Sequence, residues 1–127
     1  MSAPAVMPPC DVRHFLGPCL LLLLHERADH GYDLLERLRP FHGWDVEAPT
    51  VYRSLRSLER QGLVHSHWVP SDCGPARRRY EITPTGCSAL AVAARDLRSL
   101  RETLDRFLFR QSRAWQSASR PSPARLR

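Results

Sequence analysis

Residues 49–64 read PTVYRSLRSLERQGLV, and this stretch decides how the rest of the chain is interpreted. Val51, Leu55 and Leu58 are spaced by four and three residues, which is typical of a single buried stripe on an α-helix. Pro49 suits the first turn of such a helix, and the glycine near the end of the stretch is placed to stop it. We therefore predict a helix that begins near Pro49 and keeps one apolar face in a core.

The opposite face of this predicted helix is rich in arginine and hydroxyl groups. The residues expected to face outward or to lie near its N-terminal end are Thr50, Tyr52, Arg53, Arg56, Ser57 and Arg60. The planar guanidinium group matches phosphates and guanine edges, and the positive end of the helix dipole adds attraction for phosphate. An ordinary solvated face is the alternative, and the helix alone does not decide between them.

A strand-like hairpin is expected directly after this helix. Residues 63–69 form a strand-like run, residues 70–75 are dense in turn formers, and residues 77–83 return with Tyr80 and Ile82 on one face. Neighbouring strand residues point to opposite faces. The side chain of Arg78 is therefore expected on the Tyr80 face, and those of Arg77 and Arg79 on the other.

Two helices are expected before residue 49. The first runs from Pro18 through the apolar residues 20–24 to about Arg27; it is too short for the roughly 20 residues of a membrane span and lacks a signal-peptide cleavage site. Residues 28–31 then form a turn, and the second helix runs from about Gly31 to 40–43. Its core-facing residues are expected to be Tyr32, Leu35, Leu38 and Phe41.

The predicted order is three helices followed by a hairpin, which is the winged helix-turn-helix plan. A long helix is expected next, from about Pro84 to about Arg110. Its apolar residues alternate steps of three and four, as in a coiled-coil seam: Leu90, Ala93, Leu97, Leu100, Leu104 and Phe107. Packing on its own domain is one alternative, but the winged-helix part already has a core, so we expect a second copy of this helix to cover the seam.

Length and charge agree with this organisation. The chain has 127 residues, a formal net charge of +6 and a pI near 9.9, so it suits one compact domain with an anionic partner. We expect a mainly α fold with a small β-hairpin. Its parts are a mobile arm (1–9), a winged helix-turn-helix DNA-binding domain (10–83), a dimerisation helix (84–110) and a disordered basic tail (111–127).

Other functional signals are weak. The four cysteines have neither disulfide nor zinc-site spacing, which favours free thiols in the cytoplasm. No catalytic motif, cofactor site or metal site is recognised, and no membrane association is expected. Aromatic side chains that are predicted to line an effector pocket, although aromatics more often belong to a core, are Phe15, Phe41, Trp44 and Trp68.

Three stretches together resemble the PadR family of transcriptional regulators: HGYDL at 30–34, the helix at 49–64, and GPARRRYEITPTG at 74–86. The resemblance covers roughly residues 14–110, and the single C-terminal helix is similar to the compact PadR subgroup. It implies a homodimeric repressor that binds double-stranded DNA in successive major grooves and is released by a small molecule or another signal. The contacts it implies are Thr50, Tyr52, Arg53, Arg77 and Arg78.

One position departs from the family pattern. Ala48 stands where family members usually have a serine just ahead of the recognition helix, and alanine cannot cap helix N–H groups. Either this end of the helix is looser, or Glu47 or Thr50 substitutes for the missing cap. The rival to a DNA-binding repressor is a winged-helix interaction module that binds an acidic protein or a partner regulator.

Overall fold

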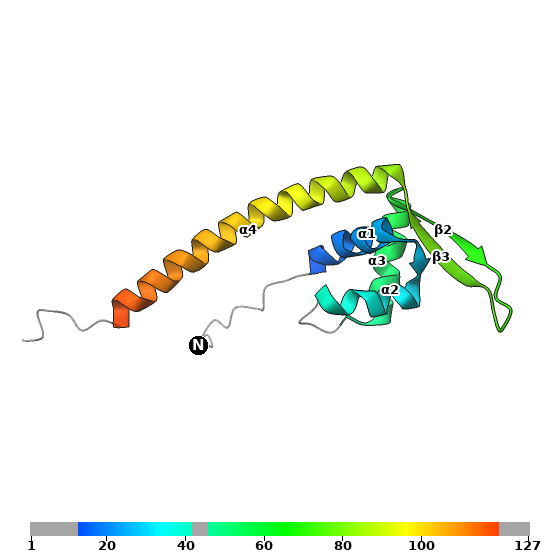
Figure 1. Ribbon diagram of the computed structural model, residues 1–127, viewed down its shortest axis with the longest axis horizontal. Coiled ribbons are helices and arrows are strands. Elements are labelled where there is room, and N and C mark those ends of the chain that lie inside the picture. Colours follow the sequence, from blue (N-terminus) through cyan, green and yellow to red (C-terminus); the bar gives the residue numbers. More distant parts are fainter. Residues whose placement is uncertain (1–12, 42–45, 120–127) are drawn as a thin grey trace, which may run out of the picture. The chain divides into compact units, whose positions relative to one another are not determined.

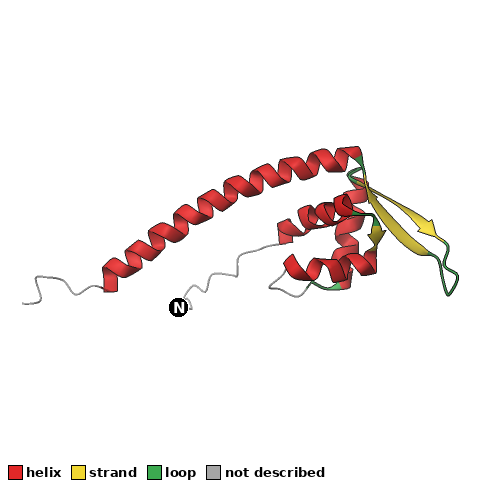
Figure 2. Cartoon of the chain, viewed as in Figure 1, coloured by secondary structure: helices red, strands yellow, loops and turns green. Residues whose placement is uncertain are grey.

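The computed structural model describes residues 13–41 and 46–119. Its elements confirm the expected fold class of a mainly helical winged helix-turn-helix with a hairpin (Figures 1 and 2). In chain order they are the 3₁₀ turn η1 (Arg13–Phe15), α1 (Leu16–Glu26), β1 (Asp29–His30), α2 (Gly31–Leu38), the 3₁₀ turn η2 (Arg39–Phe41), α3 (Ala48–Arg60), β2 (Val64–Val69), β3 (Arg77–Ile82) and α4 (Pro84–Ser119). The predicted arm at 1–9, Trp44 and the end of the predicted tail lie outside the described residues.

The core forms where the first three helices meet one face of the sheet, and Figure 1 shows α1, α2 and α3 gathered beside the hairpin. Leucines from α1, α2 and α3 bury their side chains against one another, which removes apolar surface from water. The most deeply buried members are Cys19, Leu20, Leu34, Leu38, Val51 and Leu55. Tyr80 of β3 closes this core from the sheet side.

The sheet has three antiparallel strands in the order β1-β3-β2. The hairpin of β2 and β3 was expected, but β1 was not, because residues 28–31 were predicted to be a turn. Asp29 pairs with Tyr80, and His30 pairs with Arg79. A strand of two residues has no hydrophobic period of its own, so only its long-range partner β3 reveals it.

The predicted core face of α2 is wrong at both ends. Tyr32 and Phe41 are exposed, whereas Leu34 and Leu38 are fully buried. Each step of three residues turns a helix by 300°, so a stripe drawn at such steps drifts a half-turn from Tyr32 to Phe41. The helix also ends at Leu38, which leaves Phe41 in a separate 3₁₀ turn.

Helix α4 begins at a side-chain cap and runs further than expected. The backbone N–H of Gly86 donates to Thr83 Oγ1 at 3.0 Å, and this hydroxyl donates to the carbonyl of Gly62 at 2.7 Å. The helix continues to Ser119, so the prediction that residues 111–119 belong to a disordered tail is wrong. Residues 111–119 contain neither proline nor glycine, and therefore nothing in them stops the helix.

The fold divides into two compact units, Met1–Ala91 and Val92–Arg127, with the division inside α4. In the first unit, Ala89 and Leu90 pack against the helical core. Leu90 therefore contacts its own domain, although it was expected in the dimerisation seam. No helix in the described part of the chain has the length and apolar character that a membrane crossing requires.

Candidate nucleic-acid interface

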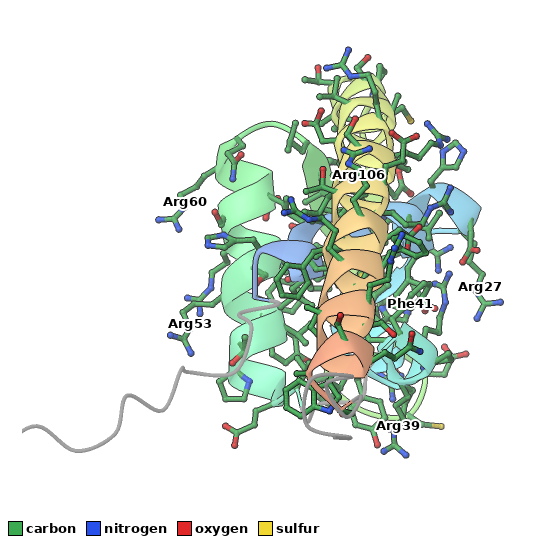
Figure 3. The ribbon with its side chains drawn as sticks, turned by 90° about the vertical axis from the view of Figure 1, so that its left-hand side faces the viewer. Arg27, Arg39, Phe41, Arg53, Arg60 and Arg106 are labelled. Carbon is green, nitrogen blue, oxygen red and sulfur yellow. The ribbon has the colours of Figure 1, made fainter. Side chains whose placement is uncertain are left out.

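Helix α3 presents its arginines to solvent, as its hydrophobic period predicts. Val51, Leu55 and Leu58 are buried, while the side chains of Arg53, Arg56 and Arg60 are exposed. Figure 3 shows Arg53 and Arg60 projecting from α3 to the same side, away from α1 and α2. Among the described residues, none of these three arginines forms an ion pair, so their guanidinium groups are available to an external anion.

Two shallow hollows flank this row of arginines. One, of about 590 Å³, is lined by Arg53, Arg56, Glu59 and Arg60. The other, of about 430 Å³, lies on the far flank of the helix and is lined by Leu16, Thr50, Arg53, Ser54, Ser57 and Arg60. The predicted residues Thr50 and Ser57 are thus half-buried beside the arginine row, whereas the arginines themselves are exposed.

The N-terminus of α3 has no side-chain cap. The capping position is Glu47, whose carbonyl accepts hydrogen bonds from the N–H groups of Thr50 at 3.0 Å and Val51 at 3.2 Å. Its carboxylate makes no capping hydrogen bond. The expectation that the Glu47 side chain substitutes for the missing serine cap is therefore wrong, because its carbonyl accepts only the hydrogen bonds that any residue at this position accepts. Its negative charge lies beside the positive end of the helix dipole.

Tyr52 packs against the start of α2. A Cβ atom placed on Gly31 would overlap the ring of Tyr52, so the tyrosine fits only because residue 31 is glycine. The HGY stretch and the TVY stretch, which are far apart in the sequence, thus meet in space. This contact fixes the outer edge of α3 against α2.

The hairpin of β2 and β3, residues 64–82, is the wing, and the turn end of its strand β3 lines a hollow beside Tyr52. This hollow, of about 330 Å³, is lined by residues of four elements, β1, α2, α3 and β3: His30, Gly31, Tyr32, Tyr52, Arg77, Arg78 and Tyr80. Tyr52 comes from α3, whereas Arg77 and Arg78 come from β3. Of the predicted contact residues, Tyr52 on the recognition helix and Arg77 and Arg78 on the hairpin therefore line one hollow, whereas the arginines of α3 line the other two.

Arg78 is held in a defined orientation. Its Nε donates to Ser66 Oγ at 2.8 Å, and its guanidinium carbon lies 5.3 Å from the centroid of the Trp68 ring. Its backbone carbonyl accepts a hydrogen bond from His30 Nδ1 at 3.2 Å. Because Ser66 is the cross-strand partner of Tyr80, the expectation that Arg78 lies on the Tyr80 face is confirmed.

The predicted effector pocket remains a prediction. Trp68 is exposed on the wing beneath Arg78, Phe15 packs against the helical core, and Phe41 is exposed in η2. Trp44 lies outside the described residues.

In the second unit, most exposed apolar side chains of α4 follow one stripe, and Val92 and Phe109 lie off it. Of the residues expected in the dimerisation seam, Ala93 and Leu97 are half-buried, and Leu100, Leu104 and Phe107 are exposed. Leu108 and Trp115 extend the same stripe and were missed. They follow Leu97 and Leu104 by eleven residues, a spacing that returns to the same face of a straight helix and that a search for heptads overlooks.

Comparisons with known proteins agree with this geometry. A family model described as the transcriptional regulator PadR-like family matches residues 20–92. Transcriptional regulator Rv3488 of Mycobacterium tuberculosis is 42% identical over 88 residues, which cover 66% of this chain and 80% of the relative.

Solved structures show the same fold. A PadR-like transcription factor from Bacteroides fragilis has 30% identity and a TM-score of 0.64, over 75% of this chain and 91% of the other. A PadR family transcriptional regulator from Eggerthella lenta has 29% identity and a TM-score of 0.63, over 76% of this chain and 85% of the other. The chain therefore belongs to the PadR-like family of transcriptional regulators, a family of DNA-binding proteins and not of enzymes.

Proposed function

We propose that the protein is a homodimeric repressor that binds double-stranded DNA through α3 and the wing. A small molecule or another signal then releases it. The observation that carries this proposal is the hollow where Tyr52 of α3 meets Arg77 and Arg78 of the wing. A helix and a hairpin that share one cationic surface can follow a groove and its flanking phosphates together.

The two elements have different tasks in this proposal. The outward residues of α3, above all Arg53 and Arg56, enter the major groove, where a guanidinium can form two hydrogen bonds with a guanine. The wing residues Arg77 and Arg78 contact the backbone beside it. Each phosphate that is neutralised releases counterions, so binding weakens steeply as salt rises.

The DNA contact is tested by comparing Arg53→Ala with Arg39→Ala. Both substitutions remove one positive charge, but Arg39 lies in η2 on another part of the surface and pairs with Glu36 (Figure 3). The probe is a labelled duplex that the wild-type protein recovers from a random-sequence pool. We expect Arg53→Ala to lose about 1–3 kcal/mol of binding free energy, and Arg39→Ala to bind like the wild type.

Equal effects of the two substitutions would mean that only net charge matters and that α3 does not read DNA. If no duplex is recovered while an acidic protein co-purifies, the winged-helix interaction module replaces the repressor.

Dimerisation is proposed to occur through the apolar stripe of α4. Large exposed apolar patches on a protein surface mark interaction sites, and a second copy of the same stripe is self-complementary about a two-fold axis. Such a dimer carries two copies of α3, which fits DNA sites made of two related halves.

A pair of phenylalanines on α4 gives a matched test. Phe107 and Phe109 are both 63% exposed, but at 100° per residue their side chains lie about 200° apart around the helix. Only Phe107 lies on the stripe. Phe107→Ala should shift the protein towards monomer in analytical ultracentrifugation, whereas Phe109→Ala should not; equal behaviour of the two variants would contradict the proposed seam.

The direction of regulation is tested with a reporter gene placed behind the recovered DNA site. Deletion of the regulator should raise reporter expression if the protein is a repressor. A fall in expression would instead identify an activator.

A further inference from the structure

One acidic side chain lies inside the otherwise cationic surface. Glu59 is on α3, beside Arg56 and Arg60, and lines the same hollow as they do. Its Oε2 accepts two hydrogen bonds from Ser66 of β2, one from the backbone N–H at 3.1 Å and one from the hydroxyl at 2.7 Å. The carboxylate therefore ties the recognition helix to the first strand of the wing.

The tie continues to the second strand. The hydroxyl of Ser66, which donates to Glu59, accepts the hydrogen bond from Arg78 Nε at 2.8 Å. The ring of Trp68 supports one face of the same guanidinium at 5.3 Å. A carboxylate on α3, a hydroxyl on β2 and a guanidinium on β3 thus form one continuous relay.

This relay orients Arg78 without a direct ion pair to Glu59. Hydrogen bonds to an ionised acceptor are shorter and stronger than those between neutral groups, so the Glu59 end of the relay anchors it. Within the described residues, Arg78 donates only through Nε, which leaves the hydrogen bonds of both Nη groups for an external acceptor. An arginine held in this way loses less side-chain freedom when it contacts a phosphate or a base.

We propose that Glu59 is a positioning residue for DNA binding, which acts through Ser66 on Arg78. The inference rests on the proposed function, because Arg78 must contact DNA for its orientation to matter. It makes a prediction opposite to that of simple electrostatics. Removal of a negative charge from a DNA-binding surface should strengthen binding by charge alone, whereas loss of this relay should weaken it.

The test measures affinity for the recovered duplex by fluorescence anisotropy at several salt concentrations. We expect Arg78→Ala and Glu59→Ala each to weaken binding by about tenfold. Each should also lower the slope of log affinity against log salt by about 0.9, the value for one phosphate contact. In the Arg78→Ala background, Glu59→Ala should add less than about twofold, because residues that act as a unit are not additive.

Three further variants distinguish the positioning of Arg78 by Glu59 from the effect of the Glu59 charge and from a folding defect. Glu59→Gln keeps the acceptor oxygen and should bind at least as tightly as the wild type. Ser66→Ala removes the hydroxyl relay and should reproduce the loss seen with Arg78→Ala. Glu81→Ala removes an exposed negative charge from β3 outside the relay, and should not weaken binding.

The inference is overturned if Glu59→Ala binds as well as the wild type while Arg78→Ala is weak. Additive losses in the double variant, or a Glu59→Gln variant as weak as Glu59→Ala, would overturn it too. If Glu59→Ala does not fold, Glu59→Gln and Ser66→Ala carry the same test. If the wild-type protein binds no duplex, or if Arg53→Ala binds the duplex as tightly as the wild type, the proposed function itself is contradicted.

Discussion

Replacement of Arg37 by methionine should remove the main hydrogen bonds and the ion pair that join α2 to α1 and β1. Arg37 Nη1 donates to Asp29 Oδ2 at 3.1 Å, and Nη2 donates to the carbonyl of Leu23 at 2.7 Å. The side chains of Arg37 and Asp29 are only 16% and 11% exposed. Methionine keeps an unbranched apolar stem but has no donor, so it isolates the loss of the polar contacts.

The size of the stability loss depends on the contacts that the Asp29 carboxylate keeps after Arg37 is removed. Removal of one partner of a buried ion pair costs about 3–5 kcal/mol, because the other charge stays buried. Asp29 keeps the hydrogen bond from the N–H of His30 at 2.9 Å and has Arg27 Nε at 3.6 Å. The Leu23 carbonyl still accepts from the N–H of Arg27 at 3.1 Å. We therefore expect the lower end, a loss of about 3 kcal/mol in the free energy of unfolding.

Urea denaturation followed by circular dichroism measures this loss, at one protein concentration because the protein is proposed to dimerise. Arg39→Met is the matched control. Arg39 pairs with Glu36 at 3.1 Å, but these side chains are 76% and 45% exposed, so we expect a change below about 0.5 kcal/mol. If the two variants lose the same stability, or Arg37→Met loses less than about 1 kcal/mol, the ion pair is not the tie that we describe.

Three further predictions concern single residues. Burial alone would raise the pKa of Asp29, but the hydrogen bonds from His30 and Arg37 outweigh it, and the pKa is lowered from its ordinary value. The stability that depends on this carboxylate is therefore fully present above about pH 4 and is lost as the pH falls through the lowered pKa. The free energy of unfolding, measured at decreasing pH, should fall in the wild type and should fall less in Asp29→Asn. Glu47→Asp should add a side-chain cap to α3 and raise stability by about 0.5–1 kcal/mol in the same denaturation assay, and no change would indicate that the cap geometry is not reached. Gly31→Ala should displace the ring of Tyr52 and weaken binding to the duplex, with a change in stability below about 1 kcal/mol because the ring is exposed and can turn aside; unchanged affinity would show that the position of Tyr52 is unimportant for DNA.

The recognition helix could be predicted because its signals are local. Its apolar residues repeat at the helical period, and proline and glycine mark its two ends. The outward position of Arg53, Arg56 and Arg60 follows from that period alone. The hairpin could be predicted for the same reason, since its turn formers separate two strand-like runs.

Other features depend on contacts between distant residues, and the sequence does not reveal them. Strand β1 exists only because β3 offers it a partner, and Gly31 is required only because Tyr52 packs on it. The relay from Glu59 to Arg78 joins three elements, none of which shows a motif for it. In α4, the heptad pattern ended at Phe107, so the continuation of the stripe was overlooked.

The arginines of this chain differ in how many of their N–H groups are already hydrogen-bonded within the protein, which the composition does not show. Both Nη groups of Arg37 donate to acceptors inside the domain, so this arginine stabilises the fold and has little left for a ligand. Arg78 is equally well oriented, but by a hydroxyl at Nε, and its Nη groups have no acceptor within the described residues. A direct carboxylate partner would have oriented Arg78 and cancelled its charge together. By placing Ser66 between Glu59 and Arg78, the fold orients Arg78 while the carboxylate occupies none of its N–H groups, and both Nη groups keep their hydrogen bonds for a ligand.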